Sequence, residues 1–410
     1  MRIPIKIKEY DPYKQLSSDD LQKLQIYLER EKLASALTIT PCGIKARYMV
    51  GVIKCKNIHI QILPKLICEN DVESCILKNL IYMLSYTKKL DIKTGESAKL
   101  ANTQNPFLEV LIREYAKSLF ECLKRLTPKK YVREEDNLNY LRGKIKFTEN
   151  IRYNTANQAK FYCEYDEFSE NNPLNQLFLF VSSCLYNISG DGNNRKMLKF
   201  IINYYSDIEL LRFDKFKADK IILTRNQQLF QKPFNLAKMF IEHTSVDLSR
   251  NKFENITLLW DMNKLFEEFV YEVMKKYENE FAYKPHAQKK RKLLIGDTSK
   301  KRDTFVDVMI EKENDKIVLD TKYKKFTNID DFSNADVFQV STYCLLHNAQ
   351  HAIILYPQYN ESKEYFYCLN TDNLKEKYKI EFRTINLKYE DISKEIDSIK
   401  NEIIQILGVF

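Results

Sequence analysis

The sequence predicts a multidomain protein of mixed class, part α+β and part α/β, and three observations lead to this expectation. The chain has 410 residues, more than one hydrophobic core usually organises. Its first part combines strand patterns with one helix and its middle part is mainly helical, whereas helices and strands alternate in its last part. We therefore expect a β-rich N-terminal region (1–90), a mainly helical middle region (91–245) and a C-terminal domain (246–410) with a mixed central sheet flanked by helices.

The N-terminal region is expected to contain a helix followed by two strands. An Asp-rich start and apolar residues three and four positions apart predict a capped amphipathic helix over Ser18–Leu33. Tyr48–Ile53 and Ile58–Leu63 flank a short turn, and the second segment alternates as a half-buried strand does. Pro64 then ends the strand pattern.

The middle region is dominated by the helical spacing of apolar residues. The predicted helices are Val72–Tyr86, Pro106–Leu126, Asn175–Tyr186, Arg195–Ser206 and Leu236–Thr244. Polar stretches at Lys93–Asn105 and Asn187–Asn194 predict exposed loops. The acidic, Asn-rich segment Glu164–Gln176 predicts a structural turn rather than a catalytic element.

Helix and strand patterns alternate in the C-terminal region. The expected order is a helix within Leu258–Tyr277, strands at Thr304–Ile310 and Ile317–Tyr323, a helix at Ala335–His347, and strands at Ala352–Tyr356 and Tyr365–Cys368. A mixed sheet with helices on its faces buries the apolar side of each of these elements.

Composition places the chain among globular intracellular proteins. Hydrophobic residues make up 44% and charged residues 30%, which excludes a disordered chain, and the net charge of +9 suits a nucleic-acid partner without demonstrating one. The 9 cysteines form no C-x-x-C pair and no zinc-ligand spacing, so we expect reduced, mostly buried thiols. Charges rather than an apolar run follow Met1, and no stretch is apolar enough to span a membrane. We expect a cytoplasmic protein with no membrane partner.

The segment Thr304–Lys324 places acidic residues inside two apolar strands. A carboxylate in an apolar strand is costly unless it is paired or binds a cation. If the turn centres between residues 313 and 314, Asp307 lies directly opposite Asp320 on one face of an antiparallel hairpin. Lys322 lies two residues beyond Asp320 and projects from the same face. A turn offset by one residue would destroy this arrangement.

Two carboxylates and one ammonium on one face suit metal-dependent hydrolysis of a phosphodiester. Carboxylate oxygens bind Mg²⁺, for which Mn²⁺ is an alternative, and a bound metal polarises phosphate and acidifies water. Lys322 would orient that water, help to deprotonate it or neutralise charge in the transition state. The alternative is a surface hairpin with a salt bridge, because Asp-x-Lys is common in a chain rich in charge. Asp303, at the start of the first strand, is a rival for the first acid.

Two features outside the hairpin favour the hydrolytic site. Gln339 and Tyr343 form a Q-x-x-x-Y pair in the following helix, and a spacing of four puts both on one helix face. Glu267, in the helix before the sheet, would add a third acid to a metal site. The alternative for Glu267 is an ordinary surface glutamate, and Glu268 or Glu272 could take its place.

These residues occur in a characteristic order along the chain. The order is Glu267, Asp307, Asp320-Thr321-Lys322, then Gln339 and Tyr343. The set resembles the Q-x-x-x-Y branch of the PD-(D/E)xK nuclease superfamily, although Val306 stands where that superfamily usually has a proline with no chemical role. The resemblance implies a nuclease fold in which Asp307, Asp320 and Glu267 bind the metal. Catalysis would use Asp307, Asp320, Lys322, Gln339 and Tyr343.

Five segments extend the resemblance over most of the chain. In order they are VGVIKCKNIHIQILPKL (50–66), YLRGKI (140–145), FYCEYDEFSENNPLNQ (161–176), NKLFEEFVYEV (263–273) and VLDTKYK (318–324). Together they resemble the McrC family, the nuclease subunits of McrBC modification-dependent restriction systems. The ordered set is more specific than any one segment.

That resemblance implies a subunit that docks on an McrB-like AAA+ GTPase hexamer, stimulates it and supplies the cutting of double-stranded DNA. The partner, rather than this chain, would read modified cytosine. The sequence has no P-loop, so we expect the chain itself to bind no nucleotide. Two alternatives are a docking or activating subunit with a degenerate, non-cleaving nuclease fold, and a stand-alone nuclease of the same superfamily.

A basic turn at Tyr140, Arg142, Gly143 and Lys144 falls within one of the matching segments. Two cations around a glycine could meet DNA phosphates, an acidic partner surface or a bound nucleotide. The resemblance favours a partner or regulatory role, and the alternative is a solvated turn before a strand at Ile145–Phe147.

A second basic segment, KPHAQKKRK at 284–292, precedes the two acidic strands. Its cations Lys289, Lys290, Arg291 and Lys292 are expected to follow the DNA backbone beside the cut site. The alternative is an exposed loop. The segment has no base-specific signature, which suits a nuclease whose specificity lies in a partner.

Overall fold

The computed structural model describes residues 5–9, 11–55, 57–68, 72–90, 106–247, 252–280, 284–294, 302–312, 315–359, 364–368 and 378–408. The chain forms two compact units, one from 1–102 together with 258–410 and the other from 103–257. The N-terminal region and the C-terminal sheet thus belong to one unit. The expected boundaries at residues 90 and 245 separate independently folding domains, and they stay predictions.

The N-terminal part of the first unit is a small sheet covered by a helix. Its elements are β1 (Ile5–Lys8), α1 (Ser18–Arg30), β2 (Leu37–Thr40), β3 (Gly43–Ala46), β4 (Met49–Cys55), β5 (Ile58–Leu63) and α2 (Glu73–Tyr86). β5 pairs in parallel with β1 and antiparallel with β4. The Ser17 side chain caps α1, and Leu24 and Leu28 of this helix share a core with Ile60 of β5. The predicted helix and both strands are confirmed.

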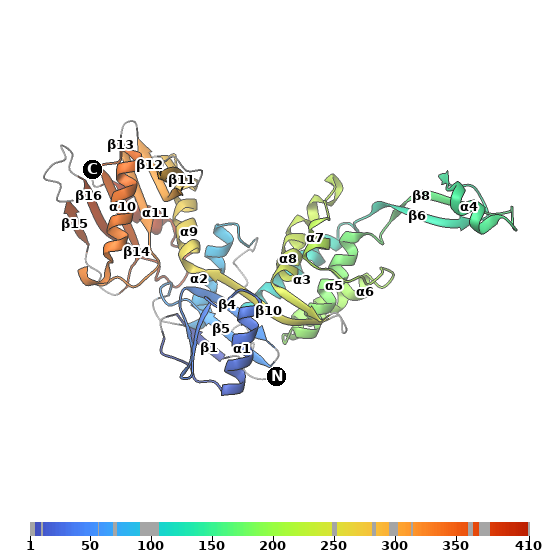
Figure 1. The fold of residues 1–410 in the computed structure, drawn as a ribbon, viewed down its shortest axis with the longest axis horizontal. Coiled ribbons are helices and arrows are strands. Elements are labelled where there is room, and N and C mark those ends of the chain that lie inside the picture. Colours follow the sequence, from blue (N-terminus) through green and yellow to red (C-terminus); the bar gives the residue numbers. More distant parts are fainter. Residues whose placement is uncertain are drawn as a thin grey trace. The chain divides into compact units, whose positions relative to one another are not determined.

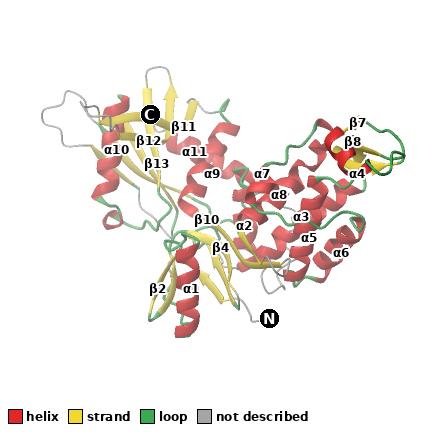
Figure 2. Cartoon of the chain, turned by 45° about the vertical axis from the view of Figure 1, so that its right-hand side comes forward, coloured by secondary structure: helices red, strands yellow, loops and turns green. Residues whose placement is uncertain are grey.

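The C-terminal part of the first unit is a 6-stranded mixed sheet. Its elements are α9 (Met262–Lys276), β11 (Lys284–Leu294), β12 (Arg302–Lys312), β13 (Asp315–Thr321), η3 (Ile329–Asp331), α10 (Asn334–His347), β14 (His351–Pro357), β15 (Tyr365–Cys368), β16 (Lys379–Ile385) and α11 (Ile396–Leu407). The strand order is β11-β12-β13-β14-β16-β15, and only the β13–β14 and β14–β16 pairs are parallel. Figure 2 shows α10 on one side of the strands and α9 with α11 on the other. The predicted mixed sheet flanked by helices is confirmed.

Some elements of this sheet carry little signal in the sequence. The basic run 284–292, for which an exposed loop was the alternative, lies in β11, and neither β16 nor α11 was expected.

The helix expected within Leu258–Tyr277 begins only at Met262, because residues 258–261 end strand β10 (Lys252–Asp261). β10 pairs antiparallel with the short β9 (Thr244–Asp247).

The second unit combines packed helices with a long hairpin. Its elements are α3 (Pro106–Leu123), β6 (Lys130–Leu138), β7 (Lys144–Ile145), α4 (Phe147–Asn154), β8 (Phe161–Ser169), α5 (Pro173–Ile188), α6 (Gly192–Tyr204), α7 (Lys215–Asp219), η2 (Arg225–Phe230) and α8 (Gln231–Glu242). α3 and α5 each pack against both α6 and α8. β6 pairs with β8 from end to end, and we call residues 130–169 the arm. The arm extends away from these helices, with α4 near its far end (Figure 1).

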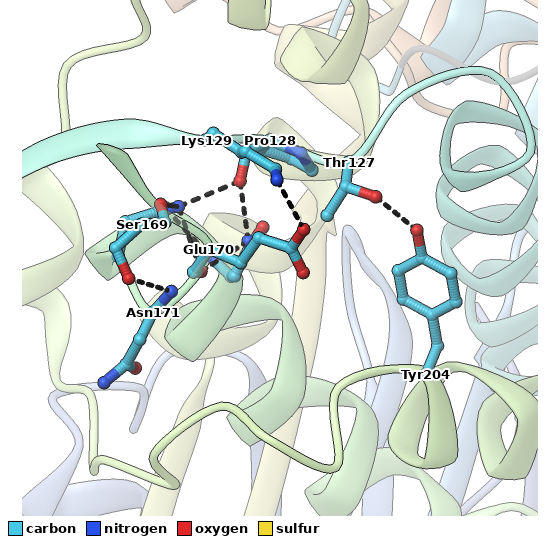
Figure 3. A network of polar contacts seen from close by, with 9 residues as sticks. Thr127, Pro128, Lys129, Ser169, Glu170, Asn171 and Tyr204 are labelled. Carbon is cyan, nitrogen blue, oxygen red and sulfur yellow. Dashed lines mark hydrogen bonds and ion pairs between the residues drawn. The ribbon is translucent and has the colours of Figure 1, made fainter. Parts of the chain in front are cut away.

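Asparagine side chains fix the base of the arm (Figure 3). Asn172 Nδ2 and Asn175 Nδ2 donate to the Pro128 carbonyl oxygen at 2.9 and 2.8 Å, and both also donate to the Glu170 carbonyl oxygen. Lys129 Nζ lies 3.1 Å from Glu170 Oε1, an ion pair between the residue before β6 and the residue after β8. The Asn-rich segment is therefore structural, as predicted, but the turn is confined to residues 170–172, because β8 continues to Ser169 and α5 begins at Pro173.

The expected loops have different outcomes. Lys93–Asn105 lies outside the described residues. The turn expected at Asn187–Asn194 is shorter, because α5 continues to Ile188 and α6 begins at Gly192. The strand expected at Ile145–Phe147 is also shorter, because α4 begins at Phe147.

The cysteines depart from the expectation of free thiols at one place. Cys68 and Cys75 form a disulfide, with Cα atoms 6.3 Å apart, because the start of α2 folds back towards the end of β5. The other cysteines are not part of this disulfide, and most of them are buried, as expected. Across the described residues, no helix is both long and apolar enough to cross a membrane.

Candidate active site on strands β12 and β13

The β12–β13 hairpin has the register that brings the two acids together. Its paired residues run from Lys312 opposite Asp315 to Val308 opposite Leu319. Asp307 and Asp320 occupy the next position of the same ladder, so their side chains leave one face of the sheet. The hairpin symmetry predicted from the sequence is confirmed.

Asp320 and Asp307 have different surroundings. Asp320 is fully buried, with Oδ2 2.8 Å from Lys322 Nζ, and no described residue donates a hydrogen bond to Oδ1. Asp307 is half-buried, and its Oδ2 accepts from Thr321 N at 3.0 Å and from Thr321 Oγ1 at 3.3 Å. Thr321 therefore holds Asp307 in place and leaves the carboxylate of Asp320 as the less satisfied anion.

Burial makes negative charge costly on these carboxyl groups. It raises the pKa of Asp307 and of Asp320, and repulsion by Asp307 raises the pKa of Asp320 further. Burial likewise raises the pKa of Glu267 to about 7, with Asp307 as the second cause. A bound cation would remove this cost, because it favours the ionised form of each carboxyl group.

Lys322 is held between Asp320 and helix α10. Its Nζ donates to Gln339 Oε1 at 3.1 Å, and Gln339 Nε2 donates to the Tyr343 hydroxyl at 2.7 Å. Burial disfavours the ammonium, but the carboxylates of Asp320 and Asp307 outweigh it and raise the pKa of Lys322. The side chain therefore stays charged, and the predicted Q-x-x-x-Y pair lies on one face of α10, where it positions this charge.

Among the glutamates of α9, Glu267 is the one that interacts with residues of this site. Gln288 Nε2 donates a hydrogen bond to Glu267 Oε1, and Asp307 acts on the Glu267 pKa. Glu268 and Glu272, the alternatives, instead form ion pairs with Lys89 and Lys88. Both alternative glutamates are therefore paired with lysines and not with residues of the two acidic strands.

Gln288 is a site residue that sequence reasoning missed. β11 pairs with β12 through Ala287 opposite Val308 and Lys289 opposite Val306, which leaves Gln288 level with Asp307. Its φ is 49°, a left-handed conformation that is uncommon for a residue other than glycine. No motif marks this glutamine in the sequence, and only its backbone conformation and its contact with Glu267 reveal it.

The donor set suits Mg²⁺ better than a metal enclosed by protein ligands. Within the described ranges, no group of three or more His, Cys, Asp or Glu side chains could hold a metal ion. Mg²⁺ is commonly bound by one or two carboxylates, with water and substrate phosphate as the other ligands. The unpartnered Oδ1 of Asp320 and the nearby Asp307 carboxylate fit that pattern.

The four expected DNA-binding cations lie on β11, and within the described residues two of them form ion pairs and two do not. Lys290 Nζ lies 2.7 Å from Asp303 Oδ2, and Lys289 forms an ion pair with a glutamate of β12. Arg291 and Lys292 are exposed, and neither forms an ion pair within the described part of the chain. Asp303, the rival for the first acid, is thus engaged by Lys290.

The turn at 140–144 lies on the arm in the second unit. Tyr140 is exposed, and the Arg142 guanidinium packs over the Tyr165 ring at 4.0 Å. Gly143 has a φ of 68°, and a Cβ at this position would lie 2.3 Å from the Glu164 carbonyl oxygen. Lys144 is exposed and opens β7. The glycine thus permits a tight turn in which Tyr140 and Lys144 are exposed.

Comparisons with known proteins point to one restriction system. A family model described as McrBC 5-methylcytosine restriction system component matches residues 44–357. A chain in the half-complex from a tetradecameric assembly of Thermococcus gammatolerans McrB AAA+ hexamers with bound McrC has a similar fold, with a TM-score of 0.76 and 21% identity over 98% of this chain and 100% of that chain. The cryo-EM structure of the Thermococcus gammatolerans McrBC complex gives a TM-score of 0.54 and 24% identity over 67% and 87% of the two chains. No curated protein matches the sequence.

Proposed function

Because the chain belongs to the McrBC family of restriction system components, we propose that it is the McrC-like, Mg²⁺-dependent DNA endonuclease subunit of such a system. It cleaves modified foreign DNA when it is docked on an McrB-like AAA+ GTPase hexamer. The hexamer drives cleavage, and the docked chain stimulates the GTPase activity of the hexamer. The convergence of Asp307, Asp320 and Lys322 on one face of a mixed sheet supports the nuclease role most directly.

In this proposal the C-terminal sheet is a PD-(D/E)xK nuclease fold. Asp307 and Asp320 would hold Mg²⁺, or Mn²⁺ in its place. Glu267, whose pKa is raised by burial and by Asp307, would be a third acid near this pair rather than part of one three-carboxylate group among the described residues. The bound metal would polarise the scissile phosphate and acidify a water molecule. Lys322, fixed by Gln339, places a permanent positive charge where the phosphate becomes more negative in the transition state.

Substrate binding would use the edge of the same sheet. β11 is an edge strand, and its exposed Arg291 and Lys292 would contact phosphates of double-stranded DNA. Ion pairing reduces the contribution of Lys289 and Lys290 unless DNA displaces their carboxylate partners. These contacts carry no base-specific information, so recognition of the modification is assigned to the partner.

Docking on the hexamer is assigned to the arm. Its far part exposes several large apolar side chains that would otherwise face water, namely Tyr140, Leu141, Phe147, Ile151 and Tyr153. Exposed apolar residues beside cations are typical of a protein interface. Arg142 and Lys144 would then act on acidic groups of the partner ring.

The test replaces one buried acid and keeps docking intact. Asp320→Asn is assayed for DNA cleavage and for partner GTP hydrolysis, with Asp315→Asn, an exposed acid of the same strand, as the matched control. We expect Asp320→Asn to lose cleavage and to keep GTPase stimulation. Cleavage that persists in Asp320→Asn would show that this site is not catalytic. Absent cleavage with GTPase stimulation retained in the wild-type complex would identify a non-cleaving, activating subunit, and efficient cleavage by the wild-type chain alone would identify a stand-alone nuclease.

A further inference from the structure

A cavity of about 290 Å³ opens in the second unit, beside the base of the arm. Its walls come from three places in the sequence, the start of β6, the start of α5 and the segment from residue 211 to residue 227. None of these residues belongs to the candidate active site. The volume lies at the lower end of ligand pockets, roughly 300–1,000 Å³, and suits one or two large side chains.

The cavity is mainly apolar, and its apolar surface continues onto the exterior. Leu174 and Phe213 are buried in its wall, whereas Leu211 is 39% exposed and Ile222 is 77% exposed at its edge. Phe216, next to the lining residue Lys217, is 68% exposed. Apolar side chains exposed around an apolar cavity favour a macromolecular partner over a small molecule.

A buried hydrogen-bond donor lies in the wall of this cavity. Gln227 is only 2% exposed, and its Oε1 accepts from Thr224 N at 3.2 Å. Its Nε2 has no hydrogen-bond acceptor among the described residues. An unpaired buried amide N–H is costly, and a ligand carbonyl or carboxylate oxygen would satisfy it.

Charge around the cavity has one sign. Its lining includes Lys130, Arg212, Lys217 and Lys220, and no acidic residue occurs among the described residues that form it. Lys217 Nζ donates to the Arg212 carbonyl oxygen at 3.2 Å, and Lys220 Nζ lies 4.0 Å from the centre of the Phe216 ring. Both ammonium groups therefore stay near the opening and favour an anionic ligand.

We propose that this cavity is a docking site for an acidic peptide segment of a partner protein that carries one bulky apolar side chain. The apolar side chain enters the cavity, a backbone carbonyl accepts from Gln227 Nε2, and carboxylates contact Lys217 and Lys220. Single-stranded nucleic acid fits less well, because its bases stack on exposed aromatic rings, whereas the exposed apolar residues that line the cavity, Leu211 and Ile222, are aliphatic and the exposed Phe216 lies outside the lining. The inference does not depend on the proposed nuclease activity.

The test measures binding of defined peptides to the full-length chain. The probe is an acetylated pentapeptide with a central phenylalanine and two acidic residues on each side, and the two comparison peptides carry central serine or flanking lysines. We expect the acidic phenylalanine peptide to bind, and each comparison peptide to bind at least about tenfold more weakly. Equal binding of the three peptides, or no binding at millimolar concentration, overturns the proposal.

Variants of exposed and buried residues place the peptide in this cavity. The double variant Lys217→Glu with Lys220→Glu should weaken binding about tenfold at low salt. The double variant Lys196→Glu with Lys199→Glu on α6 serves as the charge-matched control and should leave binding unchanged. Gln227→Glu keeps an acceptor for Thr224 N but loses the donor, so it should also weaken binding. Because residue 227 is buried, the new carboxyl group should also lower Tm, and binding is therefore measured well below the Tm of the variant. Unchanged peptide binding in the Lys217→Glu, Lys220→Glu variant would assign the surface to another ligand. Displacement of the peptide by oligodeoxythymidine in wild type, but not in that variant, would do the same.

Discussion

Replacing Asp320 by asparagine should stabilise the metal-free protein at neutral pH, even though it removes the central acid of the proposed nuclease site. Asp320 is fully buried, and burial together with repulsion from Asp307 raises the pKa of its carboxyl group. The folded protein must either keep a proton there or bear a buried negative charge. Asparagine has nearly the same shape and carries no charge.

The size of the effect follows from proton linkage. An unfolded aspartate loses its proton near pH 4, whereas the folded protein retains it to higher pH, so wild-type stability falls as pH rises through that interval. One retained proton corresponds to about 1.4 kcal/mol per pH unit, so wild type can lose at most about 3 kcal/mol between pH 5 and pH 7. The raised pKa of the Asp320 carboxyl group already includes the attraction of Lys322, and we expect the variant to gain on the order of 2 kcal/mol over wild type across this range.

The assay is thermal unfolding of wild type and Asp320→Asn in EDTA from pH 5 to pH 7.5. The variant should gain about 2–4 °C in Tm relative to wild type as pH rises, and Mg²⁺ should reduce the difference by stabilising wild type alone. A difference in Tm that does not change with pH, or that grows in favour of wild type at neutral pH in EDTA, would refute the reasoning.

Three other predictions concern positioning, docking and DNA contact. Gln339→Leu removes the acceptor that holds Lys322, and we expect single-turnover cleavage about 10–100-fold slower with GTPase stimulation unchanged. Gly143→Ala places a Cβ 2.3 Å from a carbonyl oxygen of β8. GTPase stimulation should therefore fall severalfold while the metal-dependent Tm shift persists. Normal stimulation would exclude a docking role for this turn. Arg291→Gln with Lys292→Gln should weaken DNA binding and make it less dependent on salt by about two counterions, and an unchanged salt slope would remove these cations from the DNA contact.

The β12–β13 hairpin could be predicted from the sequence because two independent patterns agree there. Apolar residues define the strands, and the polar turn between them fixes the register that sets Asp307 opposite Asp320. Helical spacing placed Gln339 and Tyr343 on one face in the same way. Such local periodicity needs no knowledge of the rest of the fold.

Features that depend on distant contacts could not be predicted in this way. β11 and the strands of the arm carry charged residues on both faces, so they lack the alternation that identifies a half-buried strand. Gln288 acts through a positive φ and a contact with α9, neither of which has a sequence signature. The Cys68–Cys75 disulfide depends on how α2 returns towards β5, which the spacing alone does not specify.

The most direct test of the account compares Asp307→Asn with Asp303→Asn in the complete complex with partner, GTP, Mg²⁺ and methylated DNA. Both substitutions remove one acid from β12, but Asp307 faces Asp320 whereas Asp303 pairs with Lys290. We predict that Asp307→Asn reduces the cleavage rate about 1,000-fold or more and that Asp303→Asn leaves it within about threefold of wild type. Cleavage retained by Asp307→Asn and lost by Asp303→Asn would contradict the proposed site.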